Sequence, residues 1–471
     1  MNHFYIGIDI GTTATKAIVF TKEGKIIRQF AKAYEMYHPK DDWSVQKPAE
    51  ILAAVLECID AITENIQPQF IAFSSAMQSL IAVDENGTPL TDVILWADNR
   101  ASDLAIQLKN SEQGKAFYQK TGIPIHTFCP MTKILWLREN EPAIFAQTHK
   151  FISIKEYVWH YLTGEYVIDS SMASGTGMMN LEDLTWNQDV LAFLDISQEK
   201  LSAIVSPEHQ AQMFEKQHTL VLGGGDGALA NLGTGAMQAG RMSLTIGTSG
   251  AVRLPIAQPF FDSKMRTQCY HLVDKQYLVL GAVNNGAVIL QWLKEAILET
   301  EESFESLFEQ AAKVEAGANG LIFVPYLLGE RAPIWDASAQ GTLLGITINH
   351  NKAHIVRATL EGILFGLLSI TEILLPASER ENICIMASGG FAKSDFWLQI
   401  TADIFQMKVV VSQTIEGSCW GAVMIGLKSL NIEVNQDNIE EKVFLPNPDN
   451  QAVYQENFRK FKRVYEALKD L

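Results

Sequence analysis

The sequence contains one short pattern twice, about half the chain apart: a β-type segment, a Gly/Thr turn and a second β-type segment. The first copy covers residues 4–20 around Gly11-Thr12-Thr13, and the second covers residues 244–254 around Gly247-Thr248-Ser249-Gly250. Each turn is short, but the β-type segments on both sides of it match as well, which strengthens the comparison. A repeat of this period indicates an internal duplication, so we expect two similar halves, each led by a β-hairpin.

Strand and helix patterns alternate along the rest of the chain, which predicts α/β layers with helices covering the strands. We expect further strands at 26–34, 70–74, 277–281, 383–387 and 409–412, and helices at 48–62, 287–298, 354–375 and 396–405. A chain of 471 residues is too long for one core. We place the boundary after the glycine-rich stretch 223–240, giving domains 1–241 and 242–471 with a ligand cleft between them.

The amino-acid composition limits the kinds of molecule that this protein is expected to bind. The net charge of -17 argues against nucleic acid or an anionic membrane surface as the main partner, because either would require a basic face. Five scattered cysteines fit reduced thiols in the cytoplasm. The first residues show no basic region of a signal peptide, and Glu361 and Glu372 interrupt the most apolar segment, so we expect that segment to be a buried helix.

The first Gly/Thr turn has the composition of a phosphate site. Gly11 lets the backbone come close to a ligand, and Thr12 and Thr13 offer hydroxyl and amide donors to phosphate oxygens. Asp9 could bind Mg²⁺, usually through water, and Lys16 could add a positive charge. A plain hairpin with a tight turn is the simpler explanation of this segment taken alone. The chain contains no Walker sequence, which excludes a P-loop kinase.

Two more glycine-rich segments follow predicted strands. In Gly223-Gly224-Gly225-Asp226-Gly227 the main chain could approach a ligand, and Asp226 could accept a hydroxyl proton during phosphoryl transfer. A flexible loop with Asp226 as a helix N-cap explains the segment equally well. Residues 389–394, which include Gly389, Gly390 and Ser394, could form a flat surface for a purine and ribose. An ordinary strand-to-helix turn explains that segment more simply.

Polar residues at two predicted strand ends could bind a polyol. Trp96, Asp98 and Arg100 supply an acid and a base suited to hydroxyl groups and a carboxylate, and Met77-Gln78 ends another strand in the same manner. A surface loop joined by ion pairs is the alternative. Lys155 is a further candidate cation, although the same segment could begin an exposed helix.

Taken together and in this order, seven segments resemble the FGGY family of carbohydrate kinases over essentially the whole chain. They are residues 7–13, 77–78, 95–100, 224–227, 246–250, 329–333 and 388–399. Within that family the resemblance is greatest to the gluconokinases, on residues 74–77, 96–100, 154–157 and 177–181. Many relatives carry histidine at the position of Gln78, so the contact with a sugar hydroxyl would change from imidazole to amide.

The resemblance implies two ribonuclease-H-like domains of the actin and hexokinase type, with ATP in the cleft and the sugar chiefly on the N-terminal domain. It implies that Asp226 is the catalytic base and that Asp9 and Asp226 hold Mg²⁺. The implied nucleotide contacts are Gly11, Thr12, Thr13, Lys16, Gly247, Thr248, Gly286, Gly389, Gly390 and Ser394. The implied sugar contacts are Met77, Gln78, Trp96, Asp98, Arg100, Lys155 and Asp226, with Arg100 the first choice for a substrate carboxylate and Lys155 the second.

The function implied is ATP-dependent phosphorylation of a sugar or sugar acid, with D-gluconate converted to 6-phosphogluconate. A ketopentose such as xylulose, glycerol or another polyol is the alternative within the family. An actin-like ATP-binding chaperone or filament protein, and a sugar-binding protein without catalysis, are the alternatives from other classes. We expect no nucleic-acid or membrane partner, and the sequence leaves a homodimer open.

Overall fold

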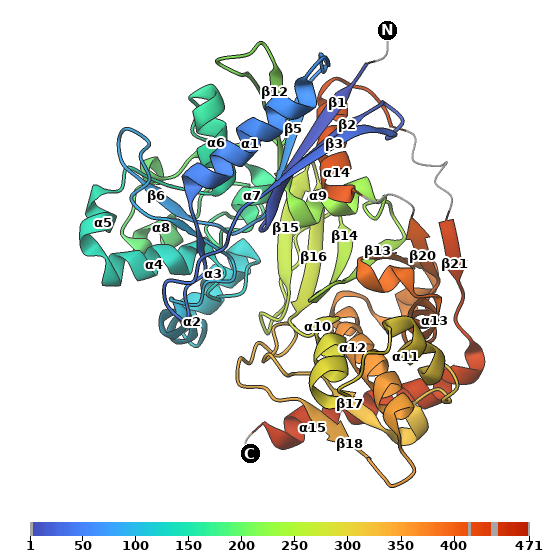
Figure 1. Cartoon of the computed structure of the whole chain (residues 1–471). Coiled ribbons are helices and arrows are strands. Elements are labelled where there is room, and N and C mark those ends of the chain that lie inside the picture. Colours follow the sequence, from blue (N-terminus) through green and yellow to red (C-terminus); the bar gives the residue numbers. More distant parts are fainter. Residues whose placement is uncertain (1–2, 413–415, 435–440, 470–471) are drawn as a thin grey trace.

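The computed structural model describes residues 3–412, 416–434 and 441–469, which form two α/β halves (Figure 1). The sheet of the first half has six strands in the order β11 (Gln210–Gln212), β12 (Thr219–Gly225), β5 (Ile71–Ser75), β1 (Tyr5–Ile10), β2 (Ala14–Phe20) and β3 (Ile26–Ala33). The sheet of the second half has seven, in the order β15 (Gln268–Val273), β16 (Gln276–Val283), β14 (Gly250–Ile256), β13 (Arg241–Ile246), β19 (Cys384–Ser388), β20 (Val409–Ser412) and β21 (Glu441–Phe444).

The two sheets share one topology. β1 pairs antiparallel with β2 and parallel with β5, and β13 pairs antiparallel with β14 and parallel with β19. Outward from these strands, β2 pairs with β3 and β14 with β16, both antiparallel, while β12 and β20 lie parallel to β5 and β19. The predicted duplication and the predicted two-domain fold of the actin and hexokinase type are therefore confirmed. Each Gly/Thr turn joins the first two strands of its sheet.

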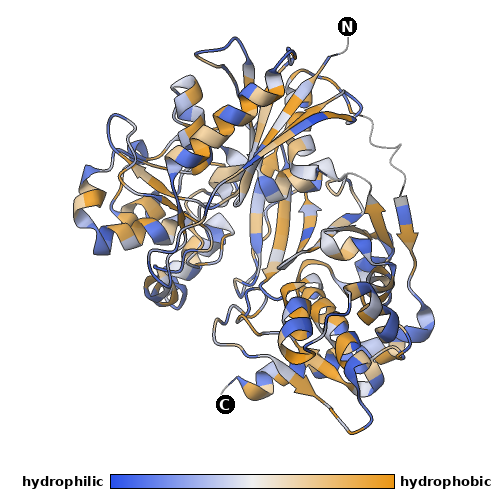
Figure 2. Cartoon of the chain, viewed as in Figure 1, coloured by the Kyte–Doolittle hydropathy of each residue, from blue (hydrophilic) through white to orange (hydrophobic). Residues whose placement is uncertain are grey.

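Helices cover these sheets much as the sequence predicts. α1 (Pro48–Thr63) begins at a proline in its first turn and buries Ile51, Val55, Ile59 and Ile62, which recur every three or four residues along one face. α10 (Val288–Trp292) is shorter than the predicted helix, because a five-residue π-helical segment, Leu293–Ile297, follows it. Hydrophobic residues concentrate in the central strands, and hydrophilic ones in the peripheral loops (Figure 2).

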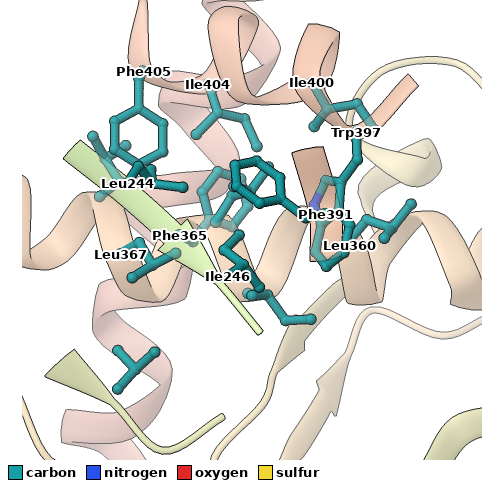
Figure 3. Packing of buried hydrophobic residues seen from close by; sticks show 14 of the residues in the cluster. Leu244, Ile246, Leu360, Phe365, Leu367, Phe391, Trp397, Ile400, Ile404 and Phe405 are labelled. Carbon is teal, nitrogen blue, oxygen red and sulfur yellow. The ribbon is translucent and has the colours of Figure 1, made fainter. Parts of the chain in front are cut away.

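α12 (Lys352–Leu374) is the central helix of the second half. Asn351 caps its start by accepting hydrogen bonds from the backbone N–H groups of Ala353 and His354. The helix is long and apolar enough to cross a membrane, but 78% of its most apolar window is buried inside the protein. Figure 3 shows Phe365 and Leu367 of α12 packed with Leu244 of β13 and with Phe405 of α13 (Asp395–Phe405). The predicted buried helix is confirmed.

α14 (Gly417–Ser429) returns from the second half to the sheet of the first, where it lies beside β1 and β2 (Figure 1). It crosses β1 so closely that a Cβ on Gly7 would lie 2.2 Å from the carbonyl oxygen of Cys419. It also packs on α9 (Asp226–Gly233), where a Cβ on Gly421 would lie 2.0 Å from the carbonyl oxygen of Leu229. The predicted boundary between residues 241 and 242 therefore assigns α14 to the second domain, although α14 packs on the sheet of the first half.

The remaining helices of the first half are short. They are α2 (Ser102–Lys109), α3 (Glu112–Thr121), α4 (Pro130–Asn140), α5 (Pro142–Gln147), α6 (Ile154–Thr163), α7 (Ser170–Ser174) and α8 (Gln188–Leu194). In the second half, α11 (Phe304–Ala311) and α15 (Gln451–Leu468) pack beside α12.

Candidate active site

Asp9 lies at the end of β1, and its carboxylate contacts two other elements. Oδ1 accepts a 2.7 Å hydrogen bond from Ser74 Oγ at the end of β5, and Oδ2 accepts a 3.0 Å hydrogen bond from Ser418 Oγ in α14. Burial raises the pKa of Asp9, while the two hydroxyl groups and the charge of Lys16 act in the opposite direction. Neither serine could be predicted from a local pattern, since both contacts depend on the tertiary fold.

The first Gly/Thr turn is held by three side chains. The Tyr34 hydroxyl donates a 2.6 Å hydrogen bond to the Gly11 carbonyl, and Gln46 Nε2 donates one of 2.7 Å to the Thr12 carbonyl. Trp96 Nε1 donates a 3.2 Å hydrogen bond to Thr12 Oγ1. Thr13 is exposed at the tip of the turn. The turn is thus fixed in one conformation with its tip open, which suits a preformed phosphate site.

Lys16 already has a partner. Its Nζ lies 2.8 Å from Glu416 Oε2, at the residue before α14, and 40% of its side chain is exposed. The prediction that Lys16 contacts the nucleotide directly is not supported by this arrangement, because the ammonium group is paired with a carboxylate. Its charge still acts on Asp9, the residue opposite it in the β1–β2 register.

Asp226 is the first residue of α9. Burial, and after it the nearby negative charge of Asp9, raise the pKa of Asp226 to about 7. A carboxyl group with a pKa near neutrality is well suited to accept a proton at physiological pH. The two carboxylates therefore share one region, although one lies in the first strand and the other more than 200 residues later in the chain.

The glycines before Asp226 allow close packing of the strand that leads to it. They belong to β12 rather than to a loop, and a Cβ on Gly223, where φ is +65°, would lie 1.8 Å from the Phe73 carbonyl oxygen. A Cβ on Gly225 would lie 2.6 Å from Met77 Sδ. Gly223 and Gly225 let β12 bulge against β5 and let Met77 pack against Gly225, while the approach of the main chain to a ligand stays a prediction.

The residues present fit a magnesium ion held largely by water and phosphate. In the part of the chain that the structure describes, no group of three or more His, Cys, Asp or Glu side chains could hold a metal ion. Asp9 and Asp226 are nevertheless close enough for the charge of one to disfavour ionisation of the other. A divalent cation near both would offset this repulsion, and Mg²⁺ in nucleotide sites commonly uses only one or two carboxylates.

A cavity of about 680 Å³ opens beside the second Gly/Thr turn. It brings together three of the predicted nucleotide contacts, Thr248, Gly390 and Ser394. Its apolar walls come from Val288, Phe308, Phe391 and Trp397 among others. A Cβ added to Gly390 would meet nothing within 4 Å, so this glycine faces open space. A predominantly apolar cavity next to a phosphate-type turn has the character of a site for a purine nucleoside.

Three other predicted nucleotide residues belong to the second Gly/Thr turn or pack against it. The Gly286 N–H donates a 3.2 Å hydrogen bond to the Thr248 carbonyl, and a Cβ on Gly286 would lie 2.5 Å from the Ser249 carbonyl oxygen. A Cβ on Gly389, where φ is +93°, would lie 2.5 Å from the Ile246 carbonyl oxygen. Gly286 and Gly389 thus allow close backbone packing. A Cβ on Gly247 would meet nothing within 4 Å, so Gly247 stays open to a ligand.

Asp98 and Arg100 form a buried pair with each other. Arg100 Nε and Nη2 lie 2.8 Å from the two carboxylate oxygens of Asp98, and the two side chains are 5% and 0% exposed. Asp98 also accepts a hydrogen bond from the Ser44 N–H, and the Arg100 guanidinium lies 3.6 Å from the ring centroid of Trp43. Both groups are buried and paired within the protein, so this arrangement does not support the prediction that they bind the substrate.

Lys155 is buried in the same way. Its Nζ lies 2.6 Å from Asp169 Oδ2, and the two side chains are 2% and 0% exposed. The segment is the start of α6, whose Ser153 and Glu156 form a reciprocal cap. Lys155 therefore neutralises the buried carboxylate of Asp169. This arrangement does not support the prediction that Lys155 binds the carboxylate of the substrate.

Gln78 connects the two halves of the protein. Its backbone has φ +69°, a rare conformation for a residue other than glycine, and Lys133 Nζ donates a hydrogen bond to its carbonyl oxygen. Its Nε2 donates a 3.0 Å hydrogen bond to the hydroxyl of Tyr270 in β15. Lys133 and Tyr270 were missed from the sequence. The one local sign of Lys133 was a single lysine among the apolar residues of α4.

Comparison with known proteins agrees with the interpretation of this region as the active site of a kinase. The models of the FGGY family of carbohydrate kinases match the N-terminal domain at residues 4–233 and the C-terminal domain at residues 242–430. The chain belongs to the FGGY family of carbohydrate kinases. It is therefore a phosphotransferase with an alcohol group as acceptor, and carbohydrate kinases of this family use ATP.

Similar proteins include kinases for two different substrates. This FGGY kinase is 40% identical to the gluconokinase of Bacillus licheniformis, over 91% of the chain and 88% of the relative, and 30% identical to the xylulose kinase of Bacillus subtilis, over 99% and 98%. Crystal structures of a gluconate kinase and of a ligand-bound xylulose kinase, both from Lactobacillus acidophilus, match with a TM-score of 0.95 each, at 35% and 36% identity. Each covers 99% of this chain and 98% of the matched one.

Proposed function

We propose that this FGGY kinase transfers the γ-phosphoryl group of ATP to the 6-hydroxyl of D-gluconate and releases 6-phosphogluconate and ADP. The position of Asp226 carries the proposal of phosphoryl transfer, since this partly buried carboxylate has a pKa raised to about 7 and lies near Asp9, which precedes the first Gly/Thr turn. The choice of gluconate is supported by the 40% identity to a gluconokinase, against 30% for the xylulose kinase. The two solved structures match equally well, so the fold does not separate the two substrates.

Asp226 orients the acceptor hydroxyl and takes its proton as the new O–P bond forms, while the bond to the ADP leaving oxygen breaks. The turns at Gly11–Thr13 and Gly247–Ser249 hold the phosphate groups through backbone N–H and threonine hydroxyl donors. Mg²⁺, held by Asp9 and Asp226 partly through water, would neutralise phosphate charge. The purine and ribose lie in the cavity beside Gly390 and Ser394. Gln78 and Trp96 contact the acceptor from the first half.

A substrate panel tests this proposal. Purified protein is given Mg-ATP with D-gluconate, D-xylulose, glycerol or no acceptor, and ADP formation is followed. We expect the highest kcat/KM with D-gluconate and little ADP without an acceptor. A higher kcat/KM for D-xylulose would replace gluconate as the substrate, and acceptor-independent ATP hydrolysis would favour an actin-like ATPase.

A cytoplasmic location and the lack of nucleic-acid or membrane partners stay predictions.

A further inference from the structure

A sugar acid needs a cation for its carboxylate, and both cations predicted from the sequence are already paired with carboxylates of the protein. Arg100 is paired with Asp98 and Lys155 with Asp169, each inside the first half. A carboxylate transferred from water into a partly buried cleft without such a partner would lose much of its solvation. The group that binds it must therefore be sought elsewhere around Asp226, including in the second half.

Arg253 is a partly buried arginine on β14 with no ion pair to a carboxylate among the residues described. Its hydrogen bond to Thr245 Oγ1 is a long one, 3.4 Å from Nη1. Its guanidinium lies at the start of α9, because a Cβ added to Gly227 would lie 3.5 Å from Arg253 Nε. Gly227 directly follows Asp226, so this cation borders the catalytic carboxylate, and each group feels the charge of the other.

Arg331 supplies a second cation to the same region. Its Nη2 donates a 3.1 Å hydrogen bond to the Val283 carbonyl, but its Nε is buried without a hydrogen-bond partner in the described part of the chain. The neighbouring Glu330 does not satisfy it, since that carboxylate accepts hydrogen bonds from Asn284 N and Asn285 Nδ2 and from the Arg331 backbone.

The two guanidinium groups disfavour each other's charge. Arg253 and Arg331 lie close enough for their positive charges to repel each other. The Tyr270 hydroxyl lies within the field of both cations and receives the hydrogen bond from Gln78, a predicted sugar contact. Two partly buried like charges around a polar hydroxyl form a site that an anion would stabilise.

We propose that Arg253, assisted by Arg331, binds the carboxylate of the sugar acid and so makes this kinase select acids over neutral polyols. The inference rests on the proposed function. Arg253 lies three residues beyond Gly250, so at the usual rise per residue it is about 10 Å along the strand from the second Gly/Thr turn. A six-carbon chain whose terminal hydroxyl meets Asp226 can direct its other end toward this pair of cations.

The test compares two ligands that differ only at one end, D-gluconate and D-glucitol, the polyol in which a CH₂OH group replaces the carboxylate. Dissociation constants are measured by calorimetry for the wild-type protein and for Arg253→Gln and Arg253→Lys. Arg266→Gln is the matched control, because it removes a positive charge from the same half at an arginine that is paired with Asp262. Binding of an unreactive ATP analogue to each variant reports on folding and on the nucleotide site.

We expect the wild type and Arg266→Gln to prefer gluconate over glucitol. Arg253→Gln should lose roughly 10- to 100-fold in gluconate affinity with little change for glucitol or the ATP analogue, and Arg253→Lys should lose less. Equal loss for both ligands would place the guanidinium on a hydroxyl group that the two ligands share and would overturn the inference. An unchanged preference in both Arg253 variants would also overturn it. A wild type that does not prefer gluconate would instead contradict the proposed substrate.

Discussion

Ser418 Oγ donates a 3.0 Å hydrogen bond to Asp9 Oδ2, across 409 positions of the sequence. Through this contact α14, which lies between β20 and β21 in the sequence, reaches the carboxylate at the first Gly/Thr turn. The affinity for Mg-ATP is therefore expected to depend on a helix that no local motif associates with the nucleotide.

Replacing Ser418 with alanine should weaken Mg-ATP binding about 3- to 10-fold, because Asp9 loses one of its two serine donors and about 1 kcal/mol of hydrogen bonding. Titration with an unreactive ATP analogue and Mg²⁺ measures this change. Ser429→Ala is the control, since Ser429 lies at the other end of α14 and contacts Gly426 and Gln210. An unchanged affinity in Ser418→Ala would show that the contact does not position Asp9 for the nucleotide.

Because α9 and α14 cross closely, even a small side chain at Gly421 should destabilise the folded protein. Gly421→Ala should lower the free energy of unfolding by about 1–3 kcal/mol, because its Cβ would lie 2.0 Å from the Leu229 carbonyl oxygen. Gly366→Ala in α12 is the matched control. A Cβ there meets nothing within 4 Å, so helix propensity should raise stability by about 0.5–1 kcal/mol. Urea unfolding of both variants checks the pair, and equal changes would contradict the crossing.

Glu156 should give the stability a specific pH dependence. Burial raises the pKa of this capping carboxyl to about 7, against 4.5 for its ordinary value, so the folded protein holds the proton more strongly than the unfolded chain. Its stabilising contribution is present below pH 4.5 and is lost as pH rises toward 7. The unfolding free energy of the wild type relative to Glu156→Gln should therefore fall by about 1–3 kcal/mol over this range.

Urea titrations of the two proteins at several pH values between 4.5 and 7.5 measure this difference. Subtracting the variant removes the contributions of other buried carboxyl groups, such as Glu330, whose pKa is also raised to about 7 by burial. Parallel pH profiles for wild type and Glu156→Gln would show that Glu156 stays ionised in the folded protein.

The hairpins and the main helices could be predicted because their signals are local. A Gly/Thr turn between β-branched segments specifies a hairpin, and the repetition of that turn indicates the duplication from the amino-acid order alone. The return of α14 to the first sheet could not be predicted in this way, since it depends on close packing at Gly7 and Gly421 against residues far away in the sequence.

The polar site was harder to predict for the same reason. Asp98, Arg100 and Lys155 have the chemistry of ligands, but the folded chain pairs them with each other or with Asp169 and buries them. Arg253 is a single arginine within an apolar strand, and only the arrangement of β14 against α9 brings it beside Asp226. Composition and spacing identify candidate groups, whereas tertiary contacts decide which of them can bind a ligand.

The most direct test of the central claim is the turnover of Asp226→Asn with Mg-ATP and D-gluconate. Asparagine has nearly the same shape and can still accept the hydrogen bond from the Gly227 N–H, so folding and binding of an ATP analogue should be retained. It cannot take the hydroxyl proton, so kcat should fall by about 10²- to 10⁴-fold. A folded variant that binds the analogue and keeps the wild-type kcat would contradict the assignment of Asp226 as the base.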